Sequence, residues 1–188
     1  MFKWEYMKEH VDKERIQYLS SRISPYLIRG DEVFDLICGY SPLCETVLNH
    51  GCSITGVDES PDAVNWLKTC YPSGCWCRQV FGVDLTDDLG GATILFLLGV
   101  AEPQHAPAFQ QYLRKLLDGS RIRVILTDTL IPTEKEMQEG RALWFQGYMR
   151  NIGVIKSLGY TKSEAGEYVV TRPLRHKRTY SIYERLHP

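Results

Sequence analysis

The sequence predicts an α/β fold, in which one domain is built on a mostly parallel sheet with helices on both faces. Strand-like and helix-like segments alternate along most of the chain, which is typical of parallel sheets. The run from Ala92 to Leu98 is almost continuously apolar, as expected of a central parallel strand covered on both sides. A length of 188 residues suits one well-packed domain and is short for two.

The first strand–turn–helix unit spans residues 32–42 and reads Glu-Val-Phe-Asp-Leu-Ile-Cys-Gly-Tyr-Ser-Pro. We expect a buried strand, a tight turn that includes Gly39, and a helix that begins at Ser41 and Pro42. Serine is a good N-cap and proline suits the first helical turn. A strand that runs into a helix N-terminus leaves free N–H groups and a positive dipole end. This unit therefore suits a nucleotide-like or carboxylate-bearing ligand.

A second unit of the same kind spans residues 53–61, and its strand ends in Asp58 and Glu59 before the helix start at Ser60–Pro61. In nucleotide-binding βαβ units, an acid about 20 residues beyond the glycine turn binds the ribose hydroxyls. Asp58 stands at about that spacing from the first turn. The two units together predict a ligand site at the ends of their strands.

These two motifs, Asp-x-x-Cys-Gly at 35–39 and Val-Asp-Glu-Ser-Pro at 57–61, resemble those of the class I S-adenosylmethionine-dependent methyltransferases. The second motif matches closely. The first departs twice, because Ile37 and Ser41 stand where the family usually has glycine. A β-branched residue disfavours positive φ and adds bulk where a ligand needs close approach to the backbone. The departures motivate an alternative, a catalytically inactive methyltransferase-like binding or scaffold protein.

The resemblance implies a Rossmann-like, doubly wound sheet of seven strands, closed by a C-terminal antiparallel hairpin. It implies one domain over residues 1–188, with a helical cap at 1–30 that closes over the cofactor and an α/β core at 31–188. A helix at 1–30 that only covers the sheet is the alternative. It also implies S-adenosylmethionine as the cofactor. A nicotinamide-dependent oxidoreductase is a weaker hypothesis, since the glycine pattern is poor for a pyrophosphate and the closing hairpin does not suit that fold.

The resemblance assigns cofactor contacts along the ends of four strands. Asp35 would orient the methionine end through the turn, Gly39 would allow close backbone approach, and Asp58 would bind the ribose hydroxyls. The full set of expected cofactor residues is Asp35, Cys38, Gly39, Asp58, Glu59, Asp84, Leu85, Leu98 and Gly99. In this set Asp84 and Leu85 would frame the adenine, while Leu98 and Gly99 would line the wall beside the transferring methyl group.

Candidate catalytic residues lie in the loop after the apolar fourth strand, at residues 99–107. Glu102 and His105 are placed to meet an acceptor, since ligands of open α/β sheets bind outside the carboxyl ends of the strands. His105 would act as general base because histidine titrates near neutral pH; an exposed loop histidine is the alternative. Methyltransferases that act on amino groups of adenine or glutamine share an Asn/Asp-Pro-Pro-aromatic tetrapeptide after the fourth strand. Residues 98–103 of this chain do not match it. A small-molecule acceptor is therefore expected.

The remaining elements follow from periodicity and turn residues. We expect helical structure over 4–27, 42–49, 61–69, 109–117 and 134–158, and strands over 78–83, 122–127, 167–171 and 179–184. Asp128, after the fifth strand, either faces the acceptor pocket or caps the next segment. In the long helix at 134–158, the expected core contacts are Leu143, Phe145, Met149, Ile152 and Ile155.

Three cysteines close together in sequence are candidate ligands of a metal ion. Cys70, Cys75 and Cys77 lack the paired spacing and the fourth ligand of structural zinc sites, so no metal is expected. Trp76 between two of them suggests a partly apolar loop. As a redox pair, Cys75 and Cys77 would point to the same face of a strand, which does not favour closure of a disulfide.

Net charge and hydropathy limit the classes of partner that are expected. The formal net charge of −1 argues against global binding of nucleic acid. The basic run at 172–178 is expected to be a solvated hairpin tip; contact with RNA is the weaker alternative. No apolar run approaches the roughly 18 residues of a membrane span, and residues 1–6 lack the features of a signal peptide. A cytoplasmic location is therefore expected.

Overall fold

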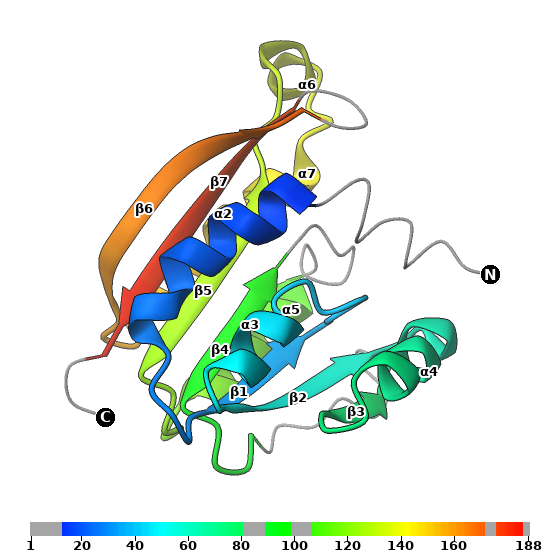
Figure 1. Ribbon diagram of the computed structural model, residues 1–188. Helices are drawn as coiled ribbons and strands as arrows, with labels where there is room; N and C mark the ends of the chain where they lie inside the picture. Colours follow the sequence, from blue (N-terminus) through cyan, green and yellow to red (C-terminus); the bar gives the residue numbers. More distant parts are fainter. Residues whose placement is uncertain (1–12, 81–88, 99–106, 172–175, 186–188) are drawn as a thin grey trace.

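A computed structural model describes residues 13–80, 89–98, 107–171 and 176–185. The described elements alternate between helices and strands as far as β3, β4 follows β3 directly, and the chain ends in a hairpin (Figure 1). In chain order the elements are α2 (Lys13–Ile23), η2 (Ser24–Tyr26), β1 (Glu32–Leu36), α3 (Cys44–Asn49), β2 (Ser53–Asp58), α4 (Pro61–Cys70), β3 (Cys75–Arg78), β4 (Ile94–Leu98), α5 (Pro107–Leu117), β5 (Val124–Leu130), α6 (Glu134–Gln138), α7 (Leu143–Ser157), β6 (Thr161–Val170) and β7 (His176–Glu184).

The strands form one seven-stranded sheet in the order β3-β2-β1-β4-β5-β7-β6. The first five strands are parallel, and β7 inserts antiparallel between β5 and β6. Strand order reverses between β1 and β4, so the carboxyl ends of these strands face a crevice at the switch point. The expected Rossmann-like sheet with a closing hairpin is confirmed.

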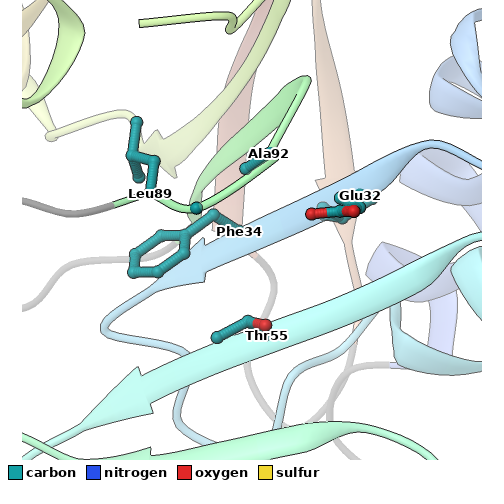
Figure 2. Close-up of a pocket in the computed structure, with 7 residues that line it drawn as sticks. Glu32, Phe34, Thr55, Leu89 and Ala92 are labelled. Carbon is teal, nitrogen blue, oxygen red and sulfur yellow. The ribbon is translucent and has the colours of Figure 1, made fainter.

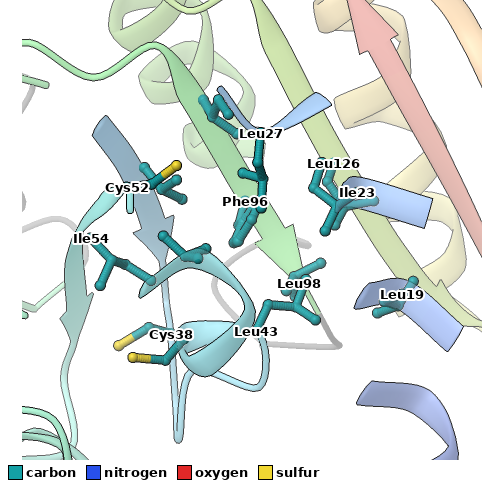
Figure 3. Close-up of a cluster of buried hydrophobic side chains, with 14 of the residues drawn as sticks. Leu19, Ile23, Leu27, Cys38, Leu43, Cys52, Ile54, Phe96, Leu98 and Leu126 are labelled. Carbon is teal, nitrogen blue, oxygen red and sulfur yellow. The ribbon is translucent and has the colours of Figure 1, made fainter. Parts of the chain in front are cut away.

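Two apolar clusters lie on opposite faces of the sheet. On one face, residues of α2, α3 and α4 pack on the strands, and Figure 3 shows Leu19, Leu43, Phe96 and Leu98 in this cluster. On the other face, α5 and α7 pack against β4 and β5. Helices therefore cover both faces, as expected (Figure 1). The described part of the N-terminal cap, α2, is a sheet-covering helix.

Several expected boundaries are wrong. The helix expected over 134–158 is two helices, because the chain reverses at Gly140, whose φ of +66° ends α6. Of its expected core contacts, Leu143 and Met149 are 60% and 52% exposed, while Ile152 and Ile155 are buried. The third strand begins at Cys75 and ends at Arg78, not at 78–83 as expected, and residues 81–83 of the expected range lie outside the described residues.

Trp76 lies in this third strand rather than in a loop. Its side chain is 3% exposed, and its indole N–H donates to the carbonyl of Tyr71 at 2.8 Å. The strands of the hairpin are also longer than expected, because β6 starts at Thr161 and β7 at His176.

Candidate cofactor site

The turn after β1 has an alternating backbone conformation. Ile37, Gly39 and Ser41 all have positive φ, at +59°, +53° and +47°. Only the middle residue is a glycine, so two side-chain-bearing residues occupy a region that costs an L-residue about 1–2 kcal/mol. The departures from glycine therefore leave the left-handed backbone conformation in place. Strain of this kind persists only where surrounding contacts maintain it.

The side chain of Ser41 binds a carboxylate of strand β1 and does not cap helix α3. Its hydroxyl donates to Oδ2 of Asp35 at 2.6 Å, and the residue is 2% exposed. The expected N-cap role is therefore wrong: α3 begins at Cys44, its N-cap residue is Leu43, and no side chain caps it. Ser41 also has a φ of +47°, whereas an N-cap residue takes an extended backbone conformation.

Asp35 is completely buried under this turn. Its side chain has no exposed surface, and Oδ1 makes no hydrogen bond within the described part of the chain. Burial raises the pKa of Asp35 to about 7, against the opposing effects of the Ser41 hydroxyl and the Arg15 guanidinium. Near neutral pH the carboxyl group is thus divided between its neutral and ionised forms, with one oxygen left to pair with a ligand.

Asp58 joins the turn of β1 to the turn of β2. Its Oδ2 accepts the backbone N–H of Gly39 at 2.8 Å, and its Oδ1 accepts that of Ser60 at 2.9 Å. Ser60 in turn caps α4, as expected, by accepting the N–H of Ala63 at 3.3 Å. A carboxylate has about four lone-pair sites. Asp58 therefore retains acceptor capacity for the pair of hydroxyls on a ribose.

Three other expected cofactor residues lie at the same edge. The backbone N–H of Cys38 donates to the carbonyl of Val57 at 2.9 Å, while its side chain is 5% exposed inside the apolar cluster. Glu59 is exposed beyond the end of β2. Leu98, the last residue of β4, is 7% exposed. The hydrogen bond from Cys38 to Val57 strengthens the contact between the two turns. The roles of all three residues toward a cofactor remain predictions.

The other expected site residues lie outside the described residues. They are Asp84, Leu85, Gly99, Glu102 and His105. The assignments of adenine contacts, of part of the methyl-side wall and of a general base to these positions stay predictions.

A buried charge cluster was missed by the sequence analysis. Asp128, within β5 and fully buried, binds two arginines and a tyrosine. Nη2 of Arg15 from α2 lies 2.7 Å from Oδ2, and Nη2 of Arg178 from β7 donates to the same oxygen at 2.6 Å. The hydroxyl of Tyr168 donates to Oδ1 at 2.6 Å. Asp128 lies inside β5 and does not cap the segment that follows. The alternative, that it faces the acceptor pocket, stays a prediction.

The cluster is connected to the cofactor turn. Nη1 of Arg15 donates to the hydroxyl of Tyr40 at 3.3 Å, which links the N-terminal cap to the residue after Gly39. Burial alone would raise the pKa of Asp128, but the two guanidinium groups and the hydrogen bonds from Arg178 and Tyr168 hold it below its ordinary value. The ionised carboxylate thus fastens the cap to the sheet near the turn.

The basic run at 172–178 is only partly described by the structure. Arg178, counted in the basic run expected at a solvated tip, is 6% exposed and bound to Asp128, so this expectation is wrong for that residue. Among the described residues, no three His, Cys, Asp or Glu side chains gather as a metal site. Within the same residues, no helix is both long and apolar enough to cross a membrane.

A pocket of about 260 Å³ lies away from the cofactor turn. Figure 2 shows Glu32, Phe34 and Thr55 from β1 and β2 lining it, together with Leu89 and Ala92. These residues lie toward the amino ends of their strands, whereas ligands of open α/β sheets bind outside the carboxyl ends. This pocket is therefore separate from the candidate cofactor site.

No protein-family model and no curated protein sequence matches this chain. Solved structures do match. A protein of Thermoplasma acidophilum superposes with a TM-score of 0.64 at 14% identity, over 98% of this chain and 96% of that one. Magnesium protoporphyrin IX methyltransferase from Synechocystis, with S-adenosylhomocysteine bound, superposes with a TM-score of 0.64 at 13% identity, over 92% and 82%.

A third match has a nucleic-acid substrate in its name. The tRNA (uracil-54, C5)-methyltransferase of Pyrococcus abyssi, in complex with S-adenosyl-L-homocysteine, superposes with a TM-score of 0.59 at 14% identity. The match covers 90% of this chain but only 38% of that one. Together these similarities show that the chain has the fold of the class I S-adenosylmethionine-dependent methyltransferases.

Proposed function

We propose that this protein, which has the class I methyltransferase fold, binds S-adenosylmethionine at the turns after β1 and β2 and methylates a small molecule. The observation that carries the proposal is the positive φ of Ile37, Gly39 and Ser41. A backbone conformation that glycine adopts easily is kept here at the expense of strain. Strained turns of this kind cluster at ligand-binding sites.

The acidic residues of this chain fit the cofactor's polar groups. Asp58 has acceptor capacity left for ribose hydroxyls after binding Gly39 and Ser60. Oδ1 of Asp35 is buried and makes no hydrogen bond within the described residues, and its ionised form would favour the cationic amino group of the methionine moiety. When bound, S-adenosylmethionine supplies a methyl group on a sulfonium for in-line displacement by an acceptor.

The chain's own contribution is to position the reactants and exclude water. The cap helix is tied to the turn by the contact from Arg15 to Tyr40 and to the sheet by Asp128. Holding donor and acceptor together can supply much of the acceleration of a displacement reaction. Glu102 or His105 would remove a proton from a hydroxyl or amine acceptor.

Charge favours a small acceptor over RNA. The net charge is −1, and Arg178 of the basic run is buried on Asp128, where it is not available to phosphates. Magnesium protoporphyrin IX methyltransferase, one of the similar structures, acts on a small molecule by its name. Because a tRNA methyltransferase is also among the similar structures, methylation of RNA is the competing outcome of the test.

A scaffold protein that binds without turnover is the second candidate. It is favoured by the fact that both oxygens of Asp58 already accept backbone N–H groups, which gives this acid a structural role independent of any ligand. Under this alternative, the protein binds S-adenosylhomocysteine weakly or not at all.

Transfer of a tritiated methyl group from S-adenosylmethionine tests the reaction. The purified protein is incubated with a cell extract divided into small-molecule, RNA and protein fractions. We expect label in the small-molecule fraction, lost with Asp58→Asn and kept with Asp62→Asn, which removes an exposed carboxylate. Label in RNA would overturn the acceptor class. Absence of label from every fraction, together with absence of cofactor binding, would favour the scaffold protein.

A further inference from the structure

Two thiols stand side by side on the edge strand of the sheet. Cys75 and Cys77 are alternate residues of β3, so their side chains leave the same face. Their sulfur atoms lie 4.0 Å apart, Cys75 is exposed and Cys77 half-buried, and neither is in a disulfide. An accessible pair of this kind has the chemistry of a chelating dithiol.

The strand that carries the thiols is fixed from its other face. Trp76 points away from them and is 3% exposed; a Cβ added to Gly56 or Gly74 would meet its ring at 2.6 or 2.4 Å. The indole N–H is also hydrogen bonded. Because Trp76 fixes the strand, the Cα and Cβ positions of the two cysteines are set before any ligand binds, and only rotation about χ1 moves the two sulfur atoms relative to each other.

The sulfur spacing suits a metal ion better than a disulfide. Metal–sulfur bonds of about 2.3 Å that reach both sulfurs across 4.0 Å enclose an angle of about 120°. That angle belongs to a three-coordinate ion. A disulfide would need the sulfurs at about 2.05 Å. Alternate Cα atoms of a strand are about 6.6 Å apart, near the upper limit of about 6.8 Å for disulfides.

We propose that Cys75 and Cys77 form a binding site for a soft, thiophilic cation, Cu(I), in which the protein supplies two thiolates and a small-molecule thiol completes the coordination. Soft thiolate ligands select Cu(I), zinc and iron–sulfur clusters. Zinc in structural sites takes four ligands in a tetrahedron, whereas two cysteines and the angle above fit a three-coordinate ion. Binding replaces the two thiol protons by one Cu(I) ion and releases both protons to solvent, with no change in oxidation state. The inference does not depend on the proposed methyltransferase activity.

Space for an external ligand exists on this face. In the parallel pairing of β2 and β3, Cys75 lies beside Thr55, which lines the pocket shown in Figure 2. The pocket and the exposed thiol thus border each other on one face of the sheet. A third ligand would approach the ion from this side.

An anaerobic competition titration tests the site. The full-length reduced protein is titrated with Cu(I) held by the coloured chelator bicinchoninate, in the presence of a small-molecule thiol. We expect one Cu(I) per chain. Cys75→Ser and Cys77→Ser should each weaken binding by about 10²–10⁴-fold, because the second thiolate then no longer binds intramolecularly. Cys70→Ser, which removes another exposed thiol, should leave it unchanged.

The outcomes separate cleanly. Failure of the intact protein to remove Cu(I) from the chelator overturns the proposal. So does equal binding by the wild-type protein and both pair variants, since the ion would then bind elsewhere. Circular dichroism of each variant checks the fold, and loss of binding with an unchanged spectrum supports the dithiol site.

Discussion

Replacement of the buried Asp35 carboxylate by an amide, Asp35→Asn, should change how stability depends on pH. The wild-type carboxyl has a pKa of about 7 in the folded state, against 3.8 as its ordinary value, chiefly because of burial. The folded state therefore holds this proton more tightly than the unfolded state. Ionisation of Asp35 destabilises the fold. That cost is absent below the ordinary pKa and fully present above the folded-state value.

The size of the effect follows from the pKa difference. One pKa unit corresponds to about 1.36 kcal/mol. About two pH units lie between pH 5 and the folded-state pKa, so the wild type should lose about 3 kcal/mol of stability relative to the variant between about pH 5 and about pH 8. The asparagine oxygen can still accept the hydroxyl of Ser41. Any cost of burying its amide group is the same at both pH values, so it cancels in the comparison.

Urea denaturation of both proteins at the two pH values measures the difference. We expect Asp35→Asn to gain stability relative to the wild type as pH rises. The control Asp118→Asn removes an exposed carboxylate at the end of α5 and should follow the wild type. Parallel dependence of wild type and Asp35→Asn on pH would refute the reasoning, because it would mean that Asp35 titrates alike in the folded and unfolded states.

Two further sets of substitutions test the packing around the site. Tyr168→Phe removes the 2.6 Å hydrogen bond to the buried Asp128 and should cost about 1.5–3 kcal/mol in thermal or urea unfolding; a neutral result would contradict the cluster. Gly56→Ala would place a Cβ 2.6 Å from the locked Trp76 ring and should cost about 1–3 kcal/mol. Gly153→Ala in α7 meets nothing within 4 Å and should instead stabilise by up to about 1 kcal/mol. Equal effects of the two glycine substitutions would contradict the packing argument.

The order of elements could be predicted because local signals agree with the fold. Apolar runs, turn residues and the Ser60–Pro61 helix start all indicate the same arrangement, and the side-chain cap at Ser60 is present. The spacing from Gly39 to Asp58 predicts a ligand site at the ends of the first two strands, and the structure brings the two residues together at 2.8 Å.

Long-range polar contacts could not be predicted in the same way. Arg15 and Asp128 are separated by 113 positions, and nothing local in the sequence pairs them. The N-cap role predicted for Ser41 is wrong. A serine before a proline is typical of a helix start, whereas here Ser41 has a left-handed backbone, its hydroxyl donates to Asp35, and the helix begins only at Cys44. Arg178 was misassigned because its neighbours in sequence are basic, although its strand position turns it inward onto Asp128.

Calorimetric titration with S-adenosylhomocysteine tests the central claim most directly. We predict micromolar binding by the wild type, loss of binding in Asp58→Asn with the fold retained, and unchanged binding in Asp62→Asn. Absence of binding by the correctly folded wild type would contradict the assignment of the turns at 37–41 and 58–60 as a cofactor site.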